Sequence, residues 1–549
     1  MRTVRWLGLV GSLLAAGWIS GCSADPGDPS GSSELGSRIV PPGKADNFIS
    51  ASAQEYVLEG TTTVTIEEEL RDASEEDKLA RVHELIGLKQ VVVGWFLNQY
   101  VTEKKSDDPN ADYGGFNSLT KHDSYEQLGI EAVDELTYEF TFQLQVGGQK
   151  NLMTDLEATL EDDGRRYFDL IIGKISNTEM AELETNNEWY RQSPWSKFNP
   201  ETVDAARLET LRLAIWPEES SKDGWFEVER LFEDGKVTID VHFGWDYHND
   251  YHLVHSRSVY GWLTGSQGFE SPVESYDDLT RTSGPLTKTI DVDGQPVLVE
   301  ISLFWGKPDT ETDPDTDEGG KVLEEDMRAS FRDREVIMFS GHSGPFYGFA
   351  LANWRKTEEG DLDDSEISSL EMPAGVYQLV IAEGCDTYGL GQAFRLNPAK
   401  PDGKDVDVVT TTSYSNASTA NSIKDSIEAI VGQSYDGTHE PPTFKEYLRE
   451  MDNNSWFFQS MYGVHGIDDN PHGHPFGRQE RLCQTCQEDA DCGGVGNECT
   501  ELNEGEKVCS YQCTADDGCP EGYACMEVAE GSYLQTRRLC APTQLSCPQ

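Results

Sequence analysis

A histidine and a cysteine in the middle of the 549-residue chain each follow a short apolar run. His342 comes after residues 336–339, and Cys385 comes after residues 377–382. A thiol attacks a carbonyl carbon as a thiolate, so it needs a neighbouring base or cation that lowers its pKa. An imidazole meets this need and can then protonate the leaving amine. The two residue types therefore suit nucleophilic acyl-transfer chemistry if the fold brings them together.

Backbone N–H donors for this chemistry lie beside both side chains. An acyl-transfer site must stabilise an oxyanion, often with backbone N–H groups. Gly344 and Gly384 allow the backbone to approach a substrate closely. Together with Ser343, these glycines are the predicted oxyanion donors.

The elements around His342 and Cys385 predict a mainly parallel α/β sheet. Continuous apolar runs separated by a helical segment are typical of strands that are covered on both faces. A helix over residues 321–332 leads into the first run, and strand–helix–strand order is the right-handed crossover unit. Because sites in such sheets lie beyond the carboxyl ends of the strands, we expect His342 and Cys385 to lie side by side.

Further elements complete the predicted central domain. They are a hairpin (287–292 and 297–304), an extended segment (347–354), a strand (406–412) and helices (365–370, 391–395, 421–431 and 444–451).

The order of these motifs resembles that of the caspase-like cysteine peptidases of clan CD. His-Ser-Gly at His342 follows one apolar strand, and Gly-Cys-Asp-Thr at Cys385 follows the next. Caspases, gingipains, separases and CHAT-domain peptidases place His-Gly and Ala/Gly-Cys in this way, and Cys-x-Thr is closest to the CHAT and gingipain-like members. The resemblance covers residues 297–431. It implies a caspase-like fold, endopeptidase activity on a peptide or protein substrate without a required cofactor, Cys385 as nucleophile and His342 as base.

The resemblance also implies where a substrate binds. The strand after Cys385 would border the pocket for the P1 side chain, so the predicted substrate-binding residues are Ser413, Tyr414, Ser415 and Asp386. Members of this clan that cleave after Arg or Lys use a buried carboxylate in that pocket. Asp386 and Asp407 are the two candidates for this role.

Ten of the 12 cysteines cluster in the last part of the chain. In an exported protein this density predicts up to five disulfides, because the compartment is oxidising. The spacing suggests two successive sets, the first beginning at Cys483 and the second at Cys509, while the connectivity stays open. Cys385 is then a lone thiol, either a nucleophile or a buried structural cysteine. The predicted disulfide cysteines are Cys483, Cys486, Cys492, Cys499, Cys509, Cys513, Cys519, Cys525, Cys540 and Cys547.

Residues 1–22 resemble the export signal of a bacterial lipoprotein. Arg2 and Arg5 precede an apolar stretch that is too short to span a bilayer stably, and the motif Ile-Ser-Gly-Cys ending at Cys22 is similar to a lipobox. The resemblance implies that Cys22 is acylated and anchors the protein in the cell envelope. Ser23 favours the outer membrane in enterobacterial-type sorting. Cleavage and secretion without a lipid is the alternative.

Composition and hydrophobic pattern divide the remaining chain into a tether and three domains. Residues 23–46 are rich in Ser, Gly, Asp and Pro and cannot bury enough apolar surface to fold. Residues 47–285 carry strand patterns and a helix that begins at Ser74, which predicts an α+β domain. Residues 286–476 are the predicted caspase-like α/β domain, and residues 477–549 are the small disulfide-rich module.

The predicted N-terminal domain contains a hairpin and a histidine cluster. Residues 226–228 and 237–243 flank Asp234-Gly235, which favours a tight turn. On a helix, His248, His252 and His255 would share a face and could ligate zinc or another transition metal. The aromatic residues around them favour a packing layer with local hydrogen bonds instead: Phe243, Trp245, Tyr247 and Tyr251, with Asp246 and Asp250 among them.

Alternating acidic residues occupy the segment 309–317. Calcium-loop spacing is present at Asp313, Asp315, Asp317 and Glu324, but Glu318 stands where the sharp turn requires glycine. A solvated acidic loop is therefore favoured over a structural calcium site.

The formal charge of -56 excludes nucleic acid as a partner, because such a chain repels phosphate backbones. It repels anionic lipid headgroups equally, so membrane contact is expected through the lipid anchor. A cell-envelope cysteine endopeptidase is the preferred function. A non-catalytic surface lipoprotein that binds a partner or glycan through its Cys-rich tail, on a degenerate caspase-like scaffold, is the alternative. A metal-dependent hydrolase built on the histidine cluster is third.

Overall fold

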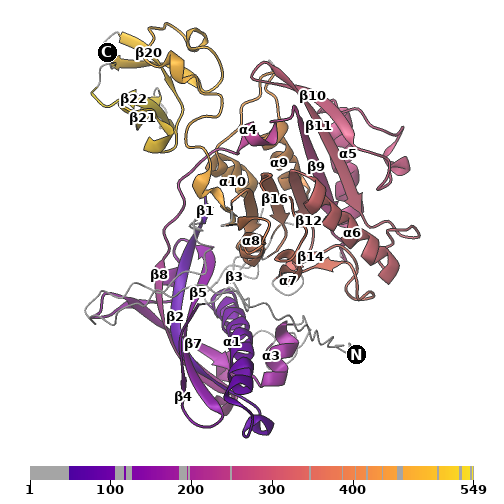
Figure 1. Cartoon of the computed structure of the whole chain (residues 1–549), viewed down its shortest axis with the longest axis vertical. Coiled ribbons are helices and arrows are strands. Elements are labelled where there is room, and N and C mark those ends of the chain that lie inside the picture. Colours follow the sequence, from indigo (N-terminus) through magenta and orange to yellow (C-terminus); the bar gives the residue numbers. More distant parts are fainter. Residues whose placement is uncertain are drawn as a thin grey trace, which may run out of the picture. The chain divides into compact units, whose positions relative to one another are not determined.

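The computed structural model describes residues 48–104, 117–118, 126–184, 195, 198–247, 250–344, 348–385, 387–401, 404–413, 415, 418–435, 437–453, 461–503, 506–530, 535–544 and 547. The predicted signal peptide, the Cys22 anchor and the whole tether lie outside these residues. An antiparallel N-terminal sheet, a mostly parallel central sheet and a disulfide-rich C-terminal region confirm the predicted multidomain α+β and α/β fold class (Figure 1).

The central sheet has eight strands in the order β1-β18-β17-β16-β12-β9-β11-β10. Antiparallel strands lie at its edges, with β10 (Leu286–Val292) on one side and β18 (Tyr462–His465) and β1 (Ile49–Ser50) on the other. The strands between them are parallel: β9 (Lys236–Phe243), β11 (Gln295–Trp305), β12 (Val336–Ser340), β16 (Gln378–Glu383) and β17 (Val406–Thr411).

The order of the parallel strands reverses between β9 and β12. Numbered along the chain, the parallel strands are arranged 2-1-3-4-5, and the chain leaves β9 in one direction for β11 and later returns on the other side as β12. In sheets of this kind the site lies outside the carboxyl ends of the strands at such a switch point. We therefore expect a functional site in the segments that follow β9, β12 and β16.

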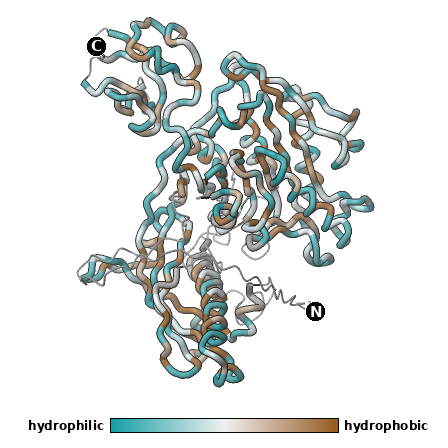
Figure 2. Tube along the Cα trace, viewed as in Figure 1, coloured by the Kyte–Doolittle hydropathy of each residue, from teal (hydrophilic) through white to brown (hydrophobic). Residues whose placement is uncertain are grey.

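Side chains of the central strands alternate between two hydrophobic cores. Met338 and Ile381 pack into one core, and Ile337 and Val380 pack into the other. Both faces are covered, which is why these strands are continuously apolar in sequence and brown in Figure 2. The first core includes α5 (Tyr251–Gly265), α9 (Asn421–Val431) and α10 (Phe444–Asn453), and the second includes α6 (Asp317–Asp333), α7 (Asp364–Ile367) and α8 (Tyr388–Arg395).

An antiparallel sheet forms the N-terminal part. Its order is β3-β5-β2-β8-β7-β6, and β4 also pairs with β5. The long helix α1 (Glu75–Lys104) packs its apolar side chains into the same core as the strands, and the Ser74 hydroxyl caps it by accepting from the Asp77 N–H. No helix among the described residues is long and apolar enough to span a membrane. The strands are β2 (Ala53–Thr65), β3 (Asn117–Ser118), β4 (Glu126–Ala132), β5 (Thr137–Gln149), β6 (Thr159–Leu160), β7 (Arg166–Gly173) and β8 (Leu208–Pro217).

The hairpin expected around Asp234-Gly235 is wrong. The segment before the turn begins the short helix α4 (Val228–Leu231), and β9 after it pairs with β11 and β12 of the central sheet. The alternating pattern of β9 was misleading because its polar side chains are also buried. Asp240 accepts from the Ser330 hydroxyl of α6 at 2.7 Å, and His242 lies 2.9 Å from the same hydroxyl and stacks on Phe304. A strand that the sequence assigned to the N-terminal domain is thus central to the second sheet.

Two small hairpins with five disulfides form the C-terminal region. They are β19 (Asn497–Asn503) with β20 (Glu506–Tyr511), and β21 (Tyr523–Glu530) with β22 (Gln535–Pro542). All ten predicted cysteines are paired, as 483–547, 486–499, 492–509, 513–525 and 519–540. Cys385 is the free cysteine of the described residues.

The pairing shifts the frame of the predicted repeat. Each hairpin and the segment before it hold four cysteines linked first to third and second to fourth, so the repeats begin at Cys486 and Cys513. In both, an aspartate carboxylate accepts from the N–H of the third cysteine: Asp489 from Cys499 at 2.7 Å, and Asp516 from Cys525 at 2.9 Å. The bond from Cys483 to Cys547 joins the two ends of the region outside the repeat.

Candidate functional site

Three neighbouring strands of the central sheet end together, and a polar side chain follows each. Ser340, the last residue of β12, is paired with the last residues of β9 and β16. His342 and Cys385 each come two residues after a pair of neighbouring strand ends, Ser340 and Glu383. Asp246 comes three residues after the end of β9, the strand that lies next to β12 on its other side. All three residues lie at the carboxyl edge of the sheet, beside the switch point.

The His342 imidazole pairs with Asp246. His342 Nε2 lies 2.8 Å from Asp246 Oδ1, and because a carboxylate only accepts, the Nε2–H is the donor. Asp246 is 4% exposed, so its bond to His342 is shielded from water. Two further bonds hold Asp246: its Oδ2 accepts from the Tyr251 N–H at the start of α5 at 3.4 Å, and its own N–H donates to His252 Nδ1 at 3.3 Å.

The backbone around Cys385 is tied to the segment that carries His342. The Ser343 hydroxyl donates to the Cys385 carbonyl at 2.6 Å, and the Gly341 N–H donates to the Glu383 carbonyl at 3.2 Å. A Cβ at Gly384 would lie 2.0 Å from Ser343 Oγ, so a side chain cannot be accommodated there without a shift. The predicted oxyanion residues Ser343 and Gly384 are thus in direct contact. Gly344 continues from them as part of the short strand β13 (Ser343–Gly344).

A cavity of about 20 Å³ lies beside His342, enough for one water molecule. Glu383 lines it and is 4% exposed. Burial raises the pKa of Glu383 to about 7, against hydrogen bonds from Ser340, Ser415, Tyr462 and Ser422 that lower it. These donors are all hydroxyls, so none of them neutralises the carboxylate.

Two buried histidines line the same cavity. Within the described part of the chain, Nε2 of His252 and Nε2 of His255 have no hydrogen-bond partner. Burial lowers the pKa of both, to about 4 for His252, so both imidazoles are neutral at pH 7. Because the Asp246 N–H donates to His252 Nδ1, the proton of His252 resides on Nε2.

The residues expected to bind substrate lie in different places in the structure. Ser415 lines the cavity, and Ser413 is buried at the end of β17. Tyr414 and Asp386 lie outside the described residues. Asp407 is at the opposite edge of the sheet, near the start of β17, where it accepts from the Tyr377 hydroxyl and the Asn470 amide, both at 2.6 Å. Asp407 is therefore far from this cavity, which is lined by the carboxyl groups of Asp246 and Glu383.

The expected metal ligands do not form a metal cluster among the described residues. The groups of three or more ligating side chains found there are cysteines of the disulfides. His248 lies outside the described residues, while His252 and His255 line the cavity.

The carboxylates of the acidic segment 309–317 accept hydrogen bonds from nearby groups of the protein. Asp313 accepts backbone N–H groups of Asp309 and Asp315, and Asp315 accepts from Asn353 at 2.5 Å. Thr316 caps α6, so Glu324 lies on that helix, where it pairs with Arg328. These carboxylates thus stabilise the loop and the start of α6 through local hydrogen bonds.

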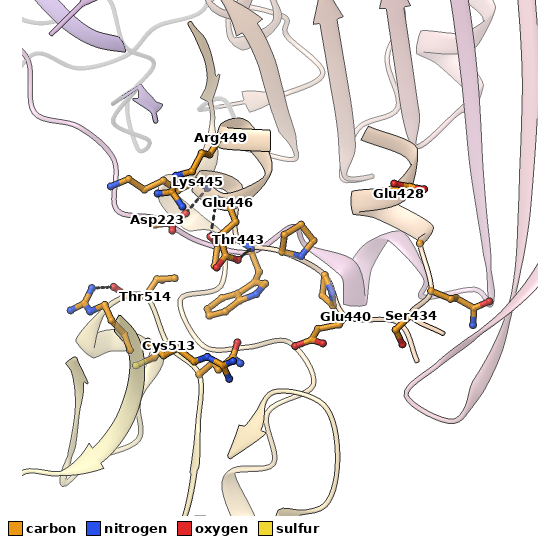
Figure 3. Close-up of a pocket in the computed structure, with 18 of the residues that line it drawn as sticks. Asp223, Glu428, Ser434, Glu440, Thr443, Lys445, Glu446, Arg449, Cys513 and Thr514 are labelled. Atoms are coloured by element: carbon orange, nitrogen blue, oxygen red, sulfur yellow. Dashed lines mark hydrogen bonds between the residues drawn. The ribbon is translucent and has the colours of Figure 1, made fainter. Parts of the chain in front are cut away.

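A larger cavity of about 900 Å³ lies elsewhere, beside the start of α10 and the disulfide-rich region (Figure 3). Asp223 accepts from the Lys445 N–H at 3.0 Å, and Thr443 and Glu446 form a reciprocal cap at the helix start. Its lining mixes acidic and basic side chains with Trp225. None of Asp246, His342 and Cys385 lines this cavity.

No family model matches this chain, and no curated protein or solved structure is significantly similar to it. The site must therefore be interpreted from its own geometry. The sequence named Asp246 only as part of a histidine cluster and missed it as the partner of His342. The signal that could have found it is the Gly-Trp-Asp that follows an apolar strand, once β9 is placed beside β12.

Proposed function

We propose that this protein is a cysteine endopeptidase in which Cys385 is the nucleophile, His342 the base and Asp246 the residue that orients the imidazole. The observation that carries the proposal is the position of His342, which is paired with a buried carboxylate on one side and follows a strand next to that of Cys385 on the other. An acid–imidazole–thiol arrangement is the general form of an activated nucleophile.

The chemistry follows from this arrangement. His342 takes the thiol proton, the sulfur bonds to the scissile carbonyl carbon, and the tetrahedral oxyanion is stabilised by backbone N–H groups of Ser343 and Gly384. The expected third donor, the Gly344 N–H, faces its strand partner Gly348 instead. The C–N bond then breaks, and His342 gives its proton to the leaving amine. A water molecule, deprotonated by His342, hydrolyses the resulting thioester and regenerates the thiol. Asp246 stabilises the imidazolium and holds Nε2, so Nδ1 is the ring nitrogen that exchanges the proton with sulfur.

The resemblance to caspase-like peptidases supports the same reading, because it assigns Cys385 and His342 the same roles. The five disulfides support an extracytoplasmic location. We place the enzyme in the cell envelope as a lipoprotein anchored through Cys22, as its first residues suggest.

The cavity beside His342 favours lysine as the P1 residue. The buried Glu383 carboxyl group, to which the described residues supply hydroxyl donors and no cation, gains a counter-ion when an ammonium group enters. The volume suits an ammonium group, which is about the size of a water molecule, better than a planar guanidinium. The Ser415 hydroxyl and His255 Nε2, which lacks a hydrogen-bond partner among the described residues, can accept from this ammonium group.

A thiol-directed peptidyl probe with lysine at P1 tests the proposal. We expect the reduced wild-type protein to be labelled and to cleave the matching fluorogenic peptide. Cys385→Ala should lose both properties, and His342→Ala should lose cleavage, while both variants keep the wild-type melting temperature. An unlabelled, inactive wild type that is correctly folded would show that the site is not catalytic.

A second candidate function is a surface protein that binds a partner or glycan through its Cys-rich tail. The larger cavity favours it, because residues of the disulfide-rich region such as Thr514 and Arg538 contribute to its lining (Figure 3). Binding to a glycan array by the Cys385→Ala variant, reduced by Arg449→Ala, would support this function independently of catalysis.

A further inference from the structure

Two aromatic rings contact the His342 imidazole, one on its face and one at its side. Tyr247 stacks on it, with ring centroids 4.5 Å apart and planes at 17°. Trp354 approaches it nearly at right angles, at 5.6 Å and 76°. The His342 side chain is 13% exposed as a result, although it lies beyond the end of a strand at the edge of the sheet.

The two rings come from different segments that are fixed to each other. Trp245 packs edge-on against Trp354 at 5.0 Å, and the Arg355 guanidinium lies 4.3 Å from the Tyr247 centroid. Backbone bonds connect the same segments, because the Trp245 N–H donates to the Ala350 carbonyl at 3.1 Å. The Ala350 N–H in turn donates to the His342 carbonyl at 3.0 Å, so the rings are attached to the backbone of the histidine that they contact.

A hydrogen bond to Asp246 fixes one edge of the imidazole but not the plane of the ring. Such a bond allows the ring to turn about the N–H···O axis, which changes the direction in which Nδ1 points. Ring stacking on Tyr247 fixes the plane. Trp354 is nearly perpendicular to both rings, at 5.6 Å from His342 and 5.7 Å from Tyr247, so it packs against the side of the stacked pair and holds the two rings together. Asp246 and Tyr247 are adjacent in sequence, so one short segment after β9 supplies both restraints.

We propose that Tyr247 and Trp354 are positioning residues that hold the His342 ring in the plane from which Nδ1 reaches Cys385. This inference rests on the proposed peptidase function. A misplaced base slows proton transfer and leaves substrate binding intact, so the two rings govern kcat rather than KM. Misplacement of a catalytic group by about 1 Å can cost roughly 100-fold in rate.

The test compares ring removal with ring retention. Tyr247→Leu and Trp354→Leu remove a ring, Tyr247→Phe keeps it, and Tyr435→Leu is the control, because Tyr435 is fully exposed and distant in sequence. The measurements are kcat and KM on the lysine fluorogenic peptide, the rate of Cys385 alkylation by iodoacetamide at pH 7, and the melting temperature.

We expect Tyr247→Leu to lower kcat by roughly 10- to 100-fold with KM within about 2-fold of wild type. Tyr247→Phe and Tyr435→Leu should match wild type, and alkylation should slow in step with kcat. Wild-type kcat in both leucine variants would overturn the inference, and so would a Phe variant as slow as Leu. If Tyr247→Leu fails to fold, the kcat of Trp354→Leu alone tests the positioning role.

Failure of the peptidase function gives a different pattern. In that case the wild type is itself inactive and unlabelled, and Cys385→Ala changes nothing. An active wild type that loses activity in Cys385→Ala but not in the leucine variants would refute the positioning role only.

Discussion

The Asp246→Asn substitution gives the sharpest test of the three-residue site. Asparagine has the shape of aspartate, so the buried packing and the bond from the Tyr251 N–H can persist. The negative charge next to His342 is lost, and the amide can present its NH2 group to Nε2 and favour the wrong tautomer.

The expected magnitude follows from the geometry. The bond between His342 Nε2 and Asp246 Oδ1 is short, at 2.8 Å, and Asp246 is 4% exposed. A hydrogen bond to a charged group contributes about 1.5–3 kcal/mol, and each 1.36 kcal/mol of transition-state stabilisation is about tenfold in rate. We therefore expect kcat/KM on the lysine peptide to fall about 10- to 150-fold.

Asp250→Asn is the matched control for this experiment. Asp250 lies in the same segment, is exposed, and has a positive φ of 51° that asparagine also tolerates. Its kcat/KM should equal that of the wild type. If Asp246→Asn retains wild-type kcat/KM while His342→Ala is inactive, the carboxylate does not orient the base and the three-residue interpretation is refuted.

Three further predictions concern Glu383, Gly384 and the disulfides. Because the pKa of Glu383 is raised to about 7 from an ordinary 4.5, the folded state binds its proton more tightly than the unfolded state, and the wild type loses stability as pH rises between these values. Between pH 4.5 and 8 the unfolding free energy of the wild type should fall by about 3 kcal/mol more than that of Glu383→Gln, because glutamine has no proton to lose. The variant should also lose the preference for lysine. Equal pH dependence of the unfolding free energy in the two proteins would contradict the assignment. Gly384→Ala should inactivate the enzyme because its Cβ would meet Ser343 Oγ at 2.0 Å, whereas Gly261→Ala on α5, with open space around it, should be tolerated; an active Gly384→Ala enzyme would disprove the close packing. Replacing Cys486 and Cys499 by serine opens a disulfide with a sequence separation of 13 and should cost the first hairpin about 3 kcal/mol, seen as faster proteolysis of the tail with unchanged labelling of Cys385.

The sequence alone determined those strands and helices whose burial follows from the apolar pattern of their own residues. The runs 336–339 and 377–382 were assigned as buried parallel strands because both faces are apolar, and β12 and β16 confirm them. The helix predicted over 421–431 is α9, which has the same bounds and buries one apolar face. The formation of disulfides by the ten clustered cysteines also followed from composition, since density and an oxidising compartment leave few alternatives.

Only the tertiary structure decided which segments meet. The alternating residues of β9 carry the local signature of a half-exposed strand, because the sequence cannot show that Ser330 of α6 buries Asp240 and His242. Once β9 lies next to β12, Asp246 reaches His342, and Glu383 rather than Asp407 lines the cavity beside it. The disulfide frame was set in the same way, by the folding of each hairpin. Periodicity reports the burial of a segment, whereas the choice of neighbour depends on contacts far apart in the chain, and it is those contacts that assemble the site around His342 and Cys385.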